Sequence, residues 1–236
     1  VLKYIFPSTR IFVMHHNDID AMIRFNQVES FKRGMNNVDH IVFGDFIKDR
    51  IVELTRIDAN RVFSIPHPTT ITINDDLNEI NSKSLIVGLG LSNDEQFIDD
   101  CIEYDKKNKT TLDYRIVLRS RSKKYEGNNL LVFTGYLTEE EYKDYFTKAA
   151  SVVVYYPDKF QYRYSGSLIN AIAETSCVFI NKMPLGLYEH SVYPHLCRII
   201  DSAEDLFTLN RSSFISCDSL TERRNYLAFH SDVNVL

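Results

Sequence analysis

Short apolar runs alternate with segments of helical periodicity along this chain. A short apolar run bounded by polar or turn-forming residues is typical of a buried strand. Nine runs predict strands, at 11–14, 40–43, 62–65, 84–87, 114–118, 130–133, 151–156, 177–180 and 197–200. Because strands that alternate with helices form βαβ units, the pattern predicts an α/β fold with a mostly parallel sheet.

Two of the intervening segments carry clear helix signals. Ile47, Ile51 and Leu54 succeed one another at spacings of four and three residues, which places them on one face of a helix. Thr138 begins a Thr-Glu-Glu-Glu capping box, and this motif predicts a helix that runs through Ala150. Both helices lie between predicted strands, as the α/β interpretation requires.

The segment Pro66-His67-Pro68 divides the predicted strands into two groups. Its prolines cannot continue a helix or a central strand, so we interpret it as an interdomain connection. Six predicted strands follow it, which suits a complete Rossmann-like domain over residues 67–206, whereas the three that precede it are too few for a closed domain. We therefore expect residues 1–66 to be the end of an incomplete Rossmann-like domain. Residues 207–236 are expected to form a helical segment that can return to the first domain.

Charge and composition narrow the function classes. A net charge of -5 and a pI near 5.8 argue against a general nucleic-acid binder, which would carry a basic face. The four cysteines lack metal-type spacing, so we interpret them as buried, reduced thiols of a cytoplasmic protein. The chain begins with Val1 rather than Met and opens in the middle of a pattern, so we expect that its natural N-terminal part is missing.

Residues 131–180 carry the most chemistry. They predict a strand, a capped helix, a strand, a loop and a second helix whose start contains glycine, an arrangement in which a phosphate can bind at the helix N-terminus. Ser165 is a good N-cap, and Gly166 allows close approach to the amides that follow, including that of Ser167. Arg163 adds a planar fork suited to phosphate oxygens. The alternative is an ordinary capped helix beside a solvated arginine.

The order and spacing of these pieces over most of the chain resembles glycosyltransferases of the GT-B architecture. The resemblance rests on the segment VDHIVFGDFIKDRIVELTRI, the connection RVFSIPHP, the strand LLVFTG, the Ala149-Ala150-Ser151-Val152 run and the segment LINAIAETSCVFI. It is closest to the retaining enzymes of glycosyltransferase family 4 (group 1). It implies transfer of a sugar from a nucleotide-diphosphate donor to a saccharide or lipid-linked acceptor, in polysaccharide or glycoconjugate synthesis. It also implies catalysis without a metal or other cofactor, by a cytoplasmic protein that can associate peripherally with a membrane.

The resemblance assigns roles to individual residues. The donor-binding residues that it implies are Arg119, Tyr162, Arg163, Ser165, Gly166, Ser167 and Asn170. His16 follows the 11–14 strand in a turn that faces the transferred sugar in the family, so it is the predicted catalytic residue that orients the reacting sugar. Strand alternation after Met14 predicts that His16 points with the buried side of the strand. Residues 15–20, HHNDID, also fit a metal site, but a solvated turn is the favoured interpretation.

The chain departs from the family at two places. Tyr162 and Asn170 stand where many retaining members have glutamates. Asn170 can still bond a ribose hydroxyl, but Tyr162 cannot replace a carboxylate. The segment 88–95 lacks the Arg and Lys that usually bind the diphosphate in the family. Arg119 and Arg121, in the basic segment 119–124 after the next strand, can compensate. The alternative is that this basic segment is simply solvated.

Two function classes therefore stay open at the level of the sequence. The first is a glycosyltransferase in which Arg163 and the helix amides stabilise the leaving diphosphate. The second is a non-catalytic glycosyltransferase-like subunit that binds a partner enzyme or an acceptor. The Arg-x-Ser-Gly helix start favours the first, and the replaced glutamates favour the second. The tyrosines at 155, 156, 162 and 164 can wall a donor pocket or serve the core.

Overall fold

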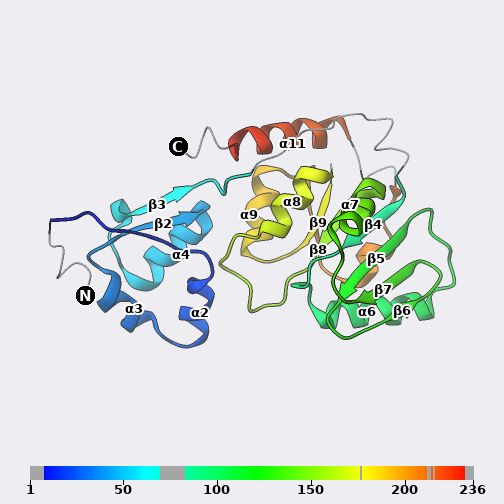
Figure 1. Ribbon diagram of the computed structural model, residues 1–236, viewed down its shortest axis with the longest axis horizontal. Coiled ribbons are helices and arrows are strands. Elements are labelled where there is room, and N and C mark those ends of the chain that lie inside the picture. The colour runs from blue at the N-terminus through cyan, green and yellow to red at the C-terminus, as the bar shows by residue number, and fades with distance from the viewer. Residues whose placement is uncertain (1–7, 70–82, 176, 212–213, 215, 232–236) are drawn as a thin grey trace. The chain divides into compact units, whose positions relative to one another are not determined.

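The computed structural model describes residues 8–69, 83–175, 177–211, 214 and 216–231 (Figure 1). Contacts within the chain divide it into two compact units. The first consists of residues 1–70, 158–165 and 229–236, and the second of residues 71–157 and 166–228. The predicted domain limits, 1–66, 67–206 and 207–236, stay predictions.

The first unit contains a three-stranded parallel sheet in the order β1-β2-β3. Its elements are β1 (Phe12–Met14), α2 (Asp18–Arg24), α3 (Val28–Met35), β2 (Asp39–Phe43), α4 (Asp45–Thr55), the 3-10 helix η1 (Ala59–Arg61) and β3 (Val62–Ile65). Val42 and Val62 of the sheet pack against Ile19 of α2 and against Ile47 and Ile51 of α4. The three predicted strands and the helical face of Ile47 and Ile51 are thus confirmed.

The second unit contains a seven-stranded sheet in the order β10-β9-β8-β4-β5-β7-β6. All its strand pairs are parallel except the β6–β7 pair. Its strands are β4 (Leu85–Gly88), β5 (Arg115–Ser120), β6 (Tyr125–Glu126), β7 (Leu130–Thr134), β8 (Ala149–Val154), β9 (Val178–Asn181) and β10 (Cys197–Ile200). The six predicted strands are confirmed. The sequence pattern missed β6, because a two-residue edge strand is too short to show a period.

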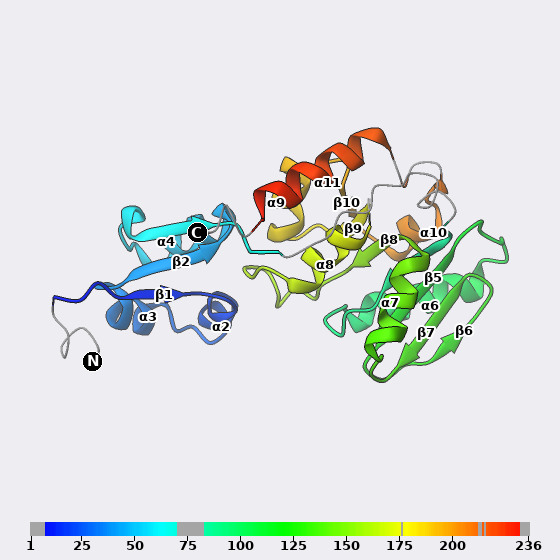
Figure 2. The same cartoon turned by 45° about the horizontal axis from the view of Figure 1, so that its top comes forward.

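Helices cover both faces of this sheet, as a parallel sheet requires. They are α6 (Glu95–Lys107), α7 (Glu139–Lys148), α8 (Gly166–Glu174), α9 (Pro184–Val192), α10 (Ala203–Phe207) and α11 (Cys217–Phe229). Figures 1 and 2 show α6 and α7 on opposite sides of the sheet. The predicted capping box is present, with Thr138 accepting from the amide of Glu141. The helix ends at Lys148 rather than Ala150, since Ala149 already begins β8.

The parallel strands of the second unit end at one common edge of the sheet. β4 ends at Gly88, β5 at Ser120, β7 at Thr134, β8 at Val154 and β9 at Asn181. We call this edge the carboxyl rim. Ligands of open α/β sheets bind at such a rim.

Two further sequence expectations concern the thiols and the chain end. Cys101, Cys177 and Cys197 are free and buried, as expected, but the expectation is wrong for Cys217, which is free and exposed. In the first unit the amide of Thr69 donates to the carbonyl of His230 at 2.9 Å.

Within the described ranges no helix is long and apolar enough to cross a membrane.

Candidate functional site

The start of α8 lies at the carboxyl rim of the second unit. The helix begins at Gly166, and its apolar face, which includes Leu168 and Ile172, is buried. Gly166, Ser167 and Asn170 are exposed. A Cβ built on Gly166 would meet no atom within 4 Å, so packing does not require glycine here. The residue instead leaves the first turn of the helix open to close approach.

Arg119 lies at the same rim and is buried. Its side chain comes from β5 and is 9% exposed. Nε donates to the carbonyl of Gly135 at 2.7 Å, and Nη1 lies 3.5 Å from the carbonyl of Leu89. Nη2 is buried and has no hydrogen-bond partner among the described residues. A buried charged donor without an acceptor is costly, so this nitrogen marks a place where an acceptor is favoured.

The loop after β4 contacts both Arg119 and α8. Leu89 accepts from Arg119, and a Cβ on the next residue, Gly90, would lie 3.7 Å from Oγ of Ser167. A Cβ there would make only an ordinary contact, so the loop lies beside the first turn of α8 but glycine is not required. Arg119 and Ser167, two of the predicted donor-binding residues, thus lie near adjacent residues of one loop.

Two buried asparagines fix the strand ends of this rim. Asn93 donates through Nδ2 to the carbonyl of Gly88 at 3.0 Å and accepts from the amide of Tyr155 at 3.2 Å. Asn181 accepts from the amide of Tyr156 at 3.0 Å and donates to the carbonyl of the same residue at 2.8 Å. Sequence reasoning missed both residues. The available signal was an asparagine directly at, or just after, the end of a predicted strand.

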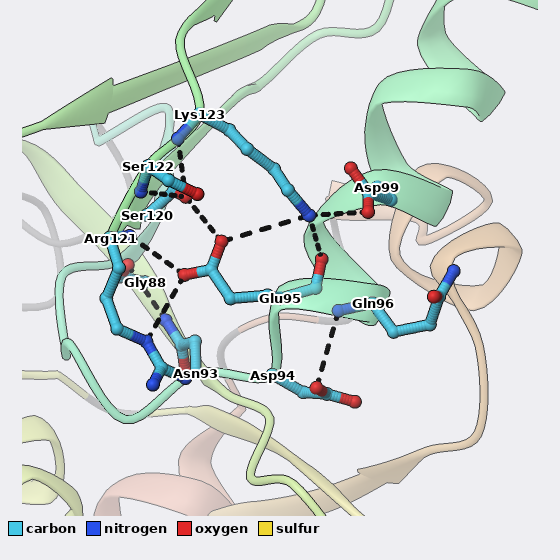
Figure 3. A network of polar contacts seen from close by, with 10 residues as sticks. All are labelled: Gly88, Asn93, Asp94, Glu95, Gln96, Asp99, Ser120, Arg121, Ser122 and Lys123. Atoms are coloured by element: carbon cyan, nitrogen blue, oxygen red, sulfur yellow. Dashed lines mark hydrogen bonds and ion pairs between the residues drawn. The ribbon is translucent and has the colours of Figure 1, made fainter.

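Two other cations of the basic segment 119–124, Arg121 and Lys123, pair with acidic residues of α6 (Figure 3). Glu95 accepts from the Ser120 hydroxyl at 2.6 Å and from the Arg121 amide at 2.8 Å, and it lies 3.5 Å from Nε of Arg121. Nζ of Lys123 lies 2.5 Å from Asp99 and donates to the Glu95 carbonyl at 2.7 Å. Burial alone would raise the pKa of Glu95, but these hydrogen bonds and cations bring it below its usual range. Arg121 and Lys123 are therefore already neutralised.

Arg163 belongs to the first unit, where an acidic side chain holds it. Its Nε donates to Oδ2 of Asp20 at 2.7 Å, and its guanidinium carbon lies 3.8 Å from the ring centre of Phe160. Oδ1 of Asp20 also accepts from the amides of Gln161 and Tyr162, at 3.1 and 2.8 Å. Asp20 is 7% exposed. One buried carboxylate thus organises the loop that carries Tyr162 and Arg163, and sequence reasoning missed it within the HHNDID string.

The predicted orientation of His16 is wrong. His16 is exposed, whereas its neighbour His15 is 1% exposed. Met14 is itself 57% exposed, because β1 is an edge strand and Met14 faces the side away from the packed core. Alternation from an exposed Met14 therefore turns His15 inward and His16 outward.

His16 joins a group of rings at the ends of β1, β2 and β3. Its ring centre lies 5.7 Å from that of Phe43 and 5.9 Å from that of His67, and His67 stacks on Tyr164 at 5.6 Å. Burial lowers the pKa of His67. Burial also lowers the pKa of His230 to about 4, although its hydrogen bond with the His67 carbonyl acts in the opposite direction. These two imidazoles are therefore neutral at neutral pH.

The predicted site residues thus fall into two sets. Arg119, Gly166, Ser167 and Asn170 belong to the second unit, and His16, Tyr162, Arg163 and Ser165 belong to the first. Ser165 is bonded directly to Gly166, the first residue of α8. Among the described residues no group of three or more His, Cys, Asp or Glu side chains is placed to hold a metal ion.

Known structures share this fold at low sequence identity. TarM matches 90% of this chain and 44% of its own length, at 13% identity and a TM-score of 0.58. A glycosyltransferase from Rickettsia africae matches 86% of this chain and 63% of its own, at 8% identity and a TM-score of 0.57. A trehalose-6-phosphate synthase studied with bisubstrate glycomimetics matches 94% of this chain and 65% of its own, at 8% identity and a TM-score of 0.60.

These matches establish the fold. The chain spans 44 to 65% of the length of these three proteins. No family model and no curated protein matches the sequence. The predicted GT-B architecture, with one whole and one partial Rossmann-like domain, is confirmed by the two sheets and by these neighbours.

Proposed function

We propose that this chain is the donor-binding part of a glycosyltransferase that uses a nucleotide-diphosphate sugar. The observation that carries the proposal is the buried Nη2 of Arg119, which lacks an acceptor and lies at the carboxyl rim of a GT-B fold. A diphosphate oxygen is an acceptor of the right charge for this nitrogen. One structural neighbour is named a glycosyltransferase, and another, a trehalose-6-phosphate synthase, was studied for the mechanism of enzymatic glycosyl transfer.

The diphosphate is proposed to bind between two kinds of donor in the second unit. Arg119 supplies a charged nitrogen, and the first turn of α8, at Gly166 and Ser167, supplies backbone amides at the positive end of a helix dipole. The Leu89-Gly90 loop contacts both Arg119 and Ser167. Asn170, one turn further along α8 and exposed, is proposed to bond the ribose hydroxyls.

Charge stabilisation is the proposed basis of the reaction. As the bond between the sugar and the diphosphate breaks, negative charge grows on the phosphate oxygens, and donors that are already oriented stabilise it. These donors can do so without a metal ion. Arg163 is proposed as an additional phosphate ligand from the segment that leads into α8, and His16 as the group that orients the transferred sugar. Transfer with retention and the likeness to family 4 belong to the same proposal, as does an acceptor that is a saccharide or a lipid-linked saccharide.

A thermal-shift screen of nucleoside diphosphates against their nucleosides tests the proposal. A specific diphosphate is expected to raise the unfolding midpoint in a concentration-dependent way, because a ligand that binds only the native state stabilises it by mass action. Arg119→Lys keeps a charge but removes the planar fork, and it should abolish the shift. Arg121→Lys is the matched control, since Glu95 already holds that side chain. If no diphosphate shifts the midpoint, or if Arg119→Lys responds like the unmodified chain, the proposal is wrong.

A further inference from the structure

Three hydrogen bonds in the first unit form a chain across two buried histidines. Nδ1 of His15 bonds to Oδ2 of Asp18, at the start of α2. Nε2 of His15 lies 2.8 Å from Nδ1 of His40, a residue of β2. Nε2 of His40 lies 3.0 Å from the carbonyl oxygen of Met35. His15 and His40 are 1% and 0% exposed, so water cannot replace the bond between the two rings.

The number of protons in this array follows from its two ends. A carbonyl oxygen can only accept, and an ionised carboxylate can only accept. Three hydrogen bonds between these ends need three protons, but two neutral imidazoles carry only two. The His15–His40 pair must therefore hold one extra proton, and its positive charge is balanced by Asp18.

The position of each proton can also be assigned. Because Nε2 of His40 faces the Met35 carbonyl, it must carry a proton and donate. Burial, followed by the neighbouring His15, lowers the pKa of His40, so this is the neutral ring and its Nδ1 accepts. His15 then donates at both nitrogens and is the imidazolium. Burial raises the pKa of Asp18, but the hydrogen bond and the charge of His15 outweigh it and bring the pKa below its usual range, so Asp18 is ionised.

The surroundings of the array agree with this assignment. The ring of Phe31, on α3, lies 5.4 Å from the ring of His15 and 5.9 Å from that of His40, within reach of a favourable cation–ring contact. The other charged groups that act on His40 are Asp39 and Arg61. Asp39 is held by Arg61 at 3.1 Å and by Arg10 at 2.5 Å, so this set carries one net positive charge, and the charge of Arg61 disfavours a further positive charge on His40.

A neutral array would be unstable. With only two protons, one of the three contacts would bring two acceptors face to face in the core. Leaving a buried polar group without its partner destabilises the folded state. The geometry can therefore be maintained only while the third proton is present.

The array is connected to the predicted site through one helix. Asp18 is the first residue of α2, and Asp20 of the same turn holds Arg163 together with the amides of Gln161 and Tyr162. We propose that His15 and His40 are positioning residues that hold one buried proton, and that this proton fixes α2 and thereby the loop that carries Arg163. The role of that loop in binding rests on the proposed function, but the proton itself does not.

Nitrogen NMR of the full chain tests the proton assignment directly. In a sample with ¹⁵N-labelled histidine at pH 7, both ring nitrogens of His15 should show the shifts of protonated nitrogen. His40 should show one protonated nitrogen, Nε2, and one bare nitrogen, Nδ1. A bare nitrogen on His15 at this pH would overturn the proposal, whether or not the chain binds any nucleotide.

The dependence of unfolding on pH supplies a second test. Unfolded histidine has a pKa of about 6.5, so above about pH 7 the native state holds one proton that the unfolded chain lacks. The folding constant of the first unit, followed by its amide signals in urea, should therefore fall by about tenfold per pH unit relative to that of His15→Gln. His16→Gln, an exposed neighbour, should keep the dependence of the unmodified chain. The same slope in His15→Gln as in the unmodified chain would overturn the proposal.

Two substitutions of His40 separate positioning from packing. A glutamine can accept through its oxygen and donate through its nitrogen, as the neutral His40 does, whereas a leucine can do neither. His40→Gln should retain slow exchange of the Arg163 Nε proton, and His40→Leu should lose it. Nucleoside diphosphate affinity should follow the same order. If no nucleotide binds either variant or the unmodified chain, the proposed function fails. The exchange rate of the Arg163 Nε proton still tests the positioning role. Equal exchange rates in both variants would refute that role.

Discussion

Arg119 and Arg163 are both predicted phosphate ligands, yet the structure places them in opposite situations. Arg119 is buried in the second unit, and one of its nitrogens has no acceptor within the described part of the chain. Arg163 is more exposed, but Asp20 holds its Nε and Phe160 covers a face of its guanidinium. An arginine is available to a ligand only where no carboxylate of the chain has already bound it. By this criterion Arg119 is the stronger candidate for the diphosphate.

The same contrast separates Arg119 from its neighbours along the sequence. Arg121 and Lys123 lie in the same basic segment, but Arg121 forms an ion pair with Glu95 and Lys123 forms one with Asp99 (Figure 3). No carboxylate approaches Arg119 in the described structure to within ion-pair distance, and the acceptors it has are carbonyl oxygens. Neutral acceptors leave its positive charge uncompensated, which favours an anionic ligand.

The largest expected effect concerns the internal carboxylate of the first unit. Asp20→Ala should lower the free energy of unfolding of that unit by about 2–4 kcal/mol, because it leaves two loop amides and a partly buried guanidinium without their acceptor. This value is reduced from that of a fully buried pair, since the Arg163 side chain is 24% exposed. Urea unfolding followed by the amide signals of the unit measures it.

Asp158→Ala is the matched control for that experiment. Asp158 is an exposed carboxylate at the start of the same loop. Its removal should change the unfolding free energy by no more than about 0.5 kcal/mol. If Asp20→Ala has an equally small effect, Asp20 does not organise the loop, and Arg163 is as available as Arg119.

The next effect compares the two arginines directly. Arg119→Ala should weaken the binding of a nucleoside diphosphate by about 1.5–3 kcal/mol, the range for a hydrogen bond to a charged group. Arg163→Ala should weaken it by less than about 1 kcal/mol, because only the nitrogens not used by Asp20 can reach a ligand. Neither variant should alter binding of the bare nucleoside. Titration calorimetry of both variants with both ligands gives the four values, and a larger loss in Arg163→Ala would reverse the comparison.

Much of the fold could be predicted from the sequence because its strands are buried on both faces. Every residue of β8 and β9 is buried, and each strand contains a continuous apolar run, at 152–154 and 178–180. The prediction missed β6 because a strand of two residues at a sheet edge shows neither an apolar run nor an alternation of apolar and polar residues. The orientation of His16 was wrong because the prediction took β1 to be buried at Met14, whereas this edge strand exposes it.

The candidate site was harder to predict than the fold. Arg119 and the α8 start were found from their positions after strands and before a helix, which are local features of the sequence. The pairing of Asp20 with Arg163 joins residues 143 positions apart, and that of Glu95 with Arg121 joins residues 26 apart. No local pattern contains such contacts, because they arise only when the chain has folded. The sequence therefore indicates where cations lie but not which of them remain available.

A smaller effect is expected at Asn170, which tests the ribose rather than the phosphates. Asn170→Ala should weaken nucleoside and nucleoside diphosphate alike, by about 0.5–1.5 kcal/mol, the value of a hydrogen bond between neutral groups. Glu174→Ala, an exposed change on the same helix, is the control and should leave both affinities unchanged. A loss confined to the diphosphate would mean that Asn170 lies at the phosphates, and calorimetry distinguishes the two outcomes.

The smallest effect concerns the carboxylate that occupies Arg121 and Lys123. The pKa of Glu95 is lowered in the folded chain, because the hydrogen bonds from Arg121 and Ser120 outweigh its burial. A lowered pKa means that the stabilisation is complete above the unfolded value, about 4.3, and is lost as the pH falls through the folded value. At neutral pH, Glu95→Gln should therefore cost roughly 0.5–1 kcal/mol, a small amount because the pairs are partly exposed.

The loss of stability in Glu95→Gln should vanish in acid, and this distinguishes the effect of the Glu95 charge from that of its packing. Asp18 and Glu141 also have lowered pKa values, so the acid unfolding of the chain alone does not isolate Glu95. The difference in unfolding free energy between the unmodified chain and Glu95→Gln does isolate it, and it should shrink below about pH 4. A difference that stays constant with pH would mean that Glu95 acts by packing. Arg121 would then be as uncompensated as Arg119, and the distinction between these two arginines would no longer hold.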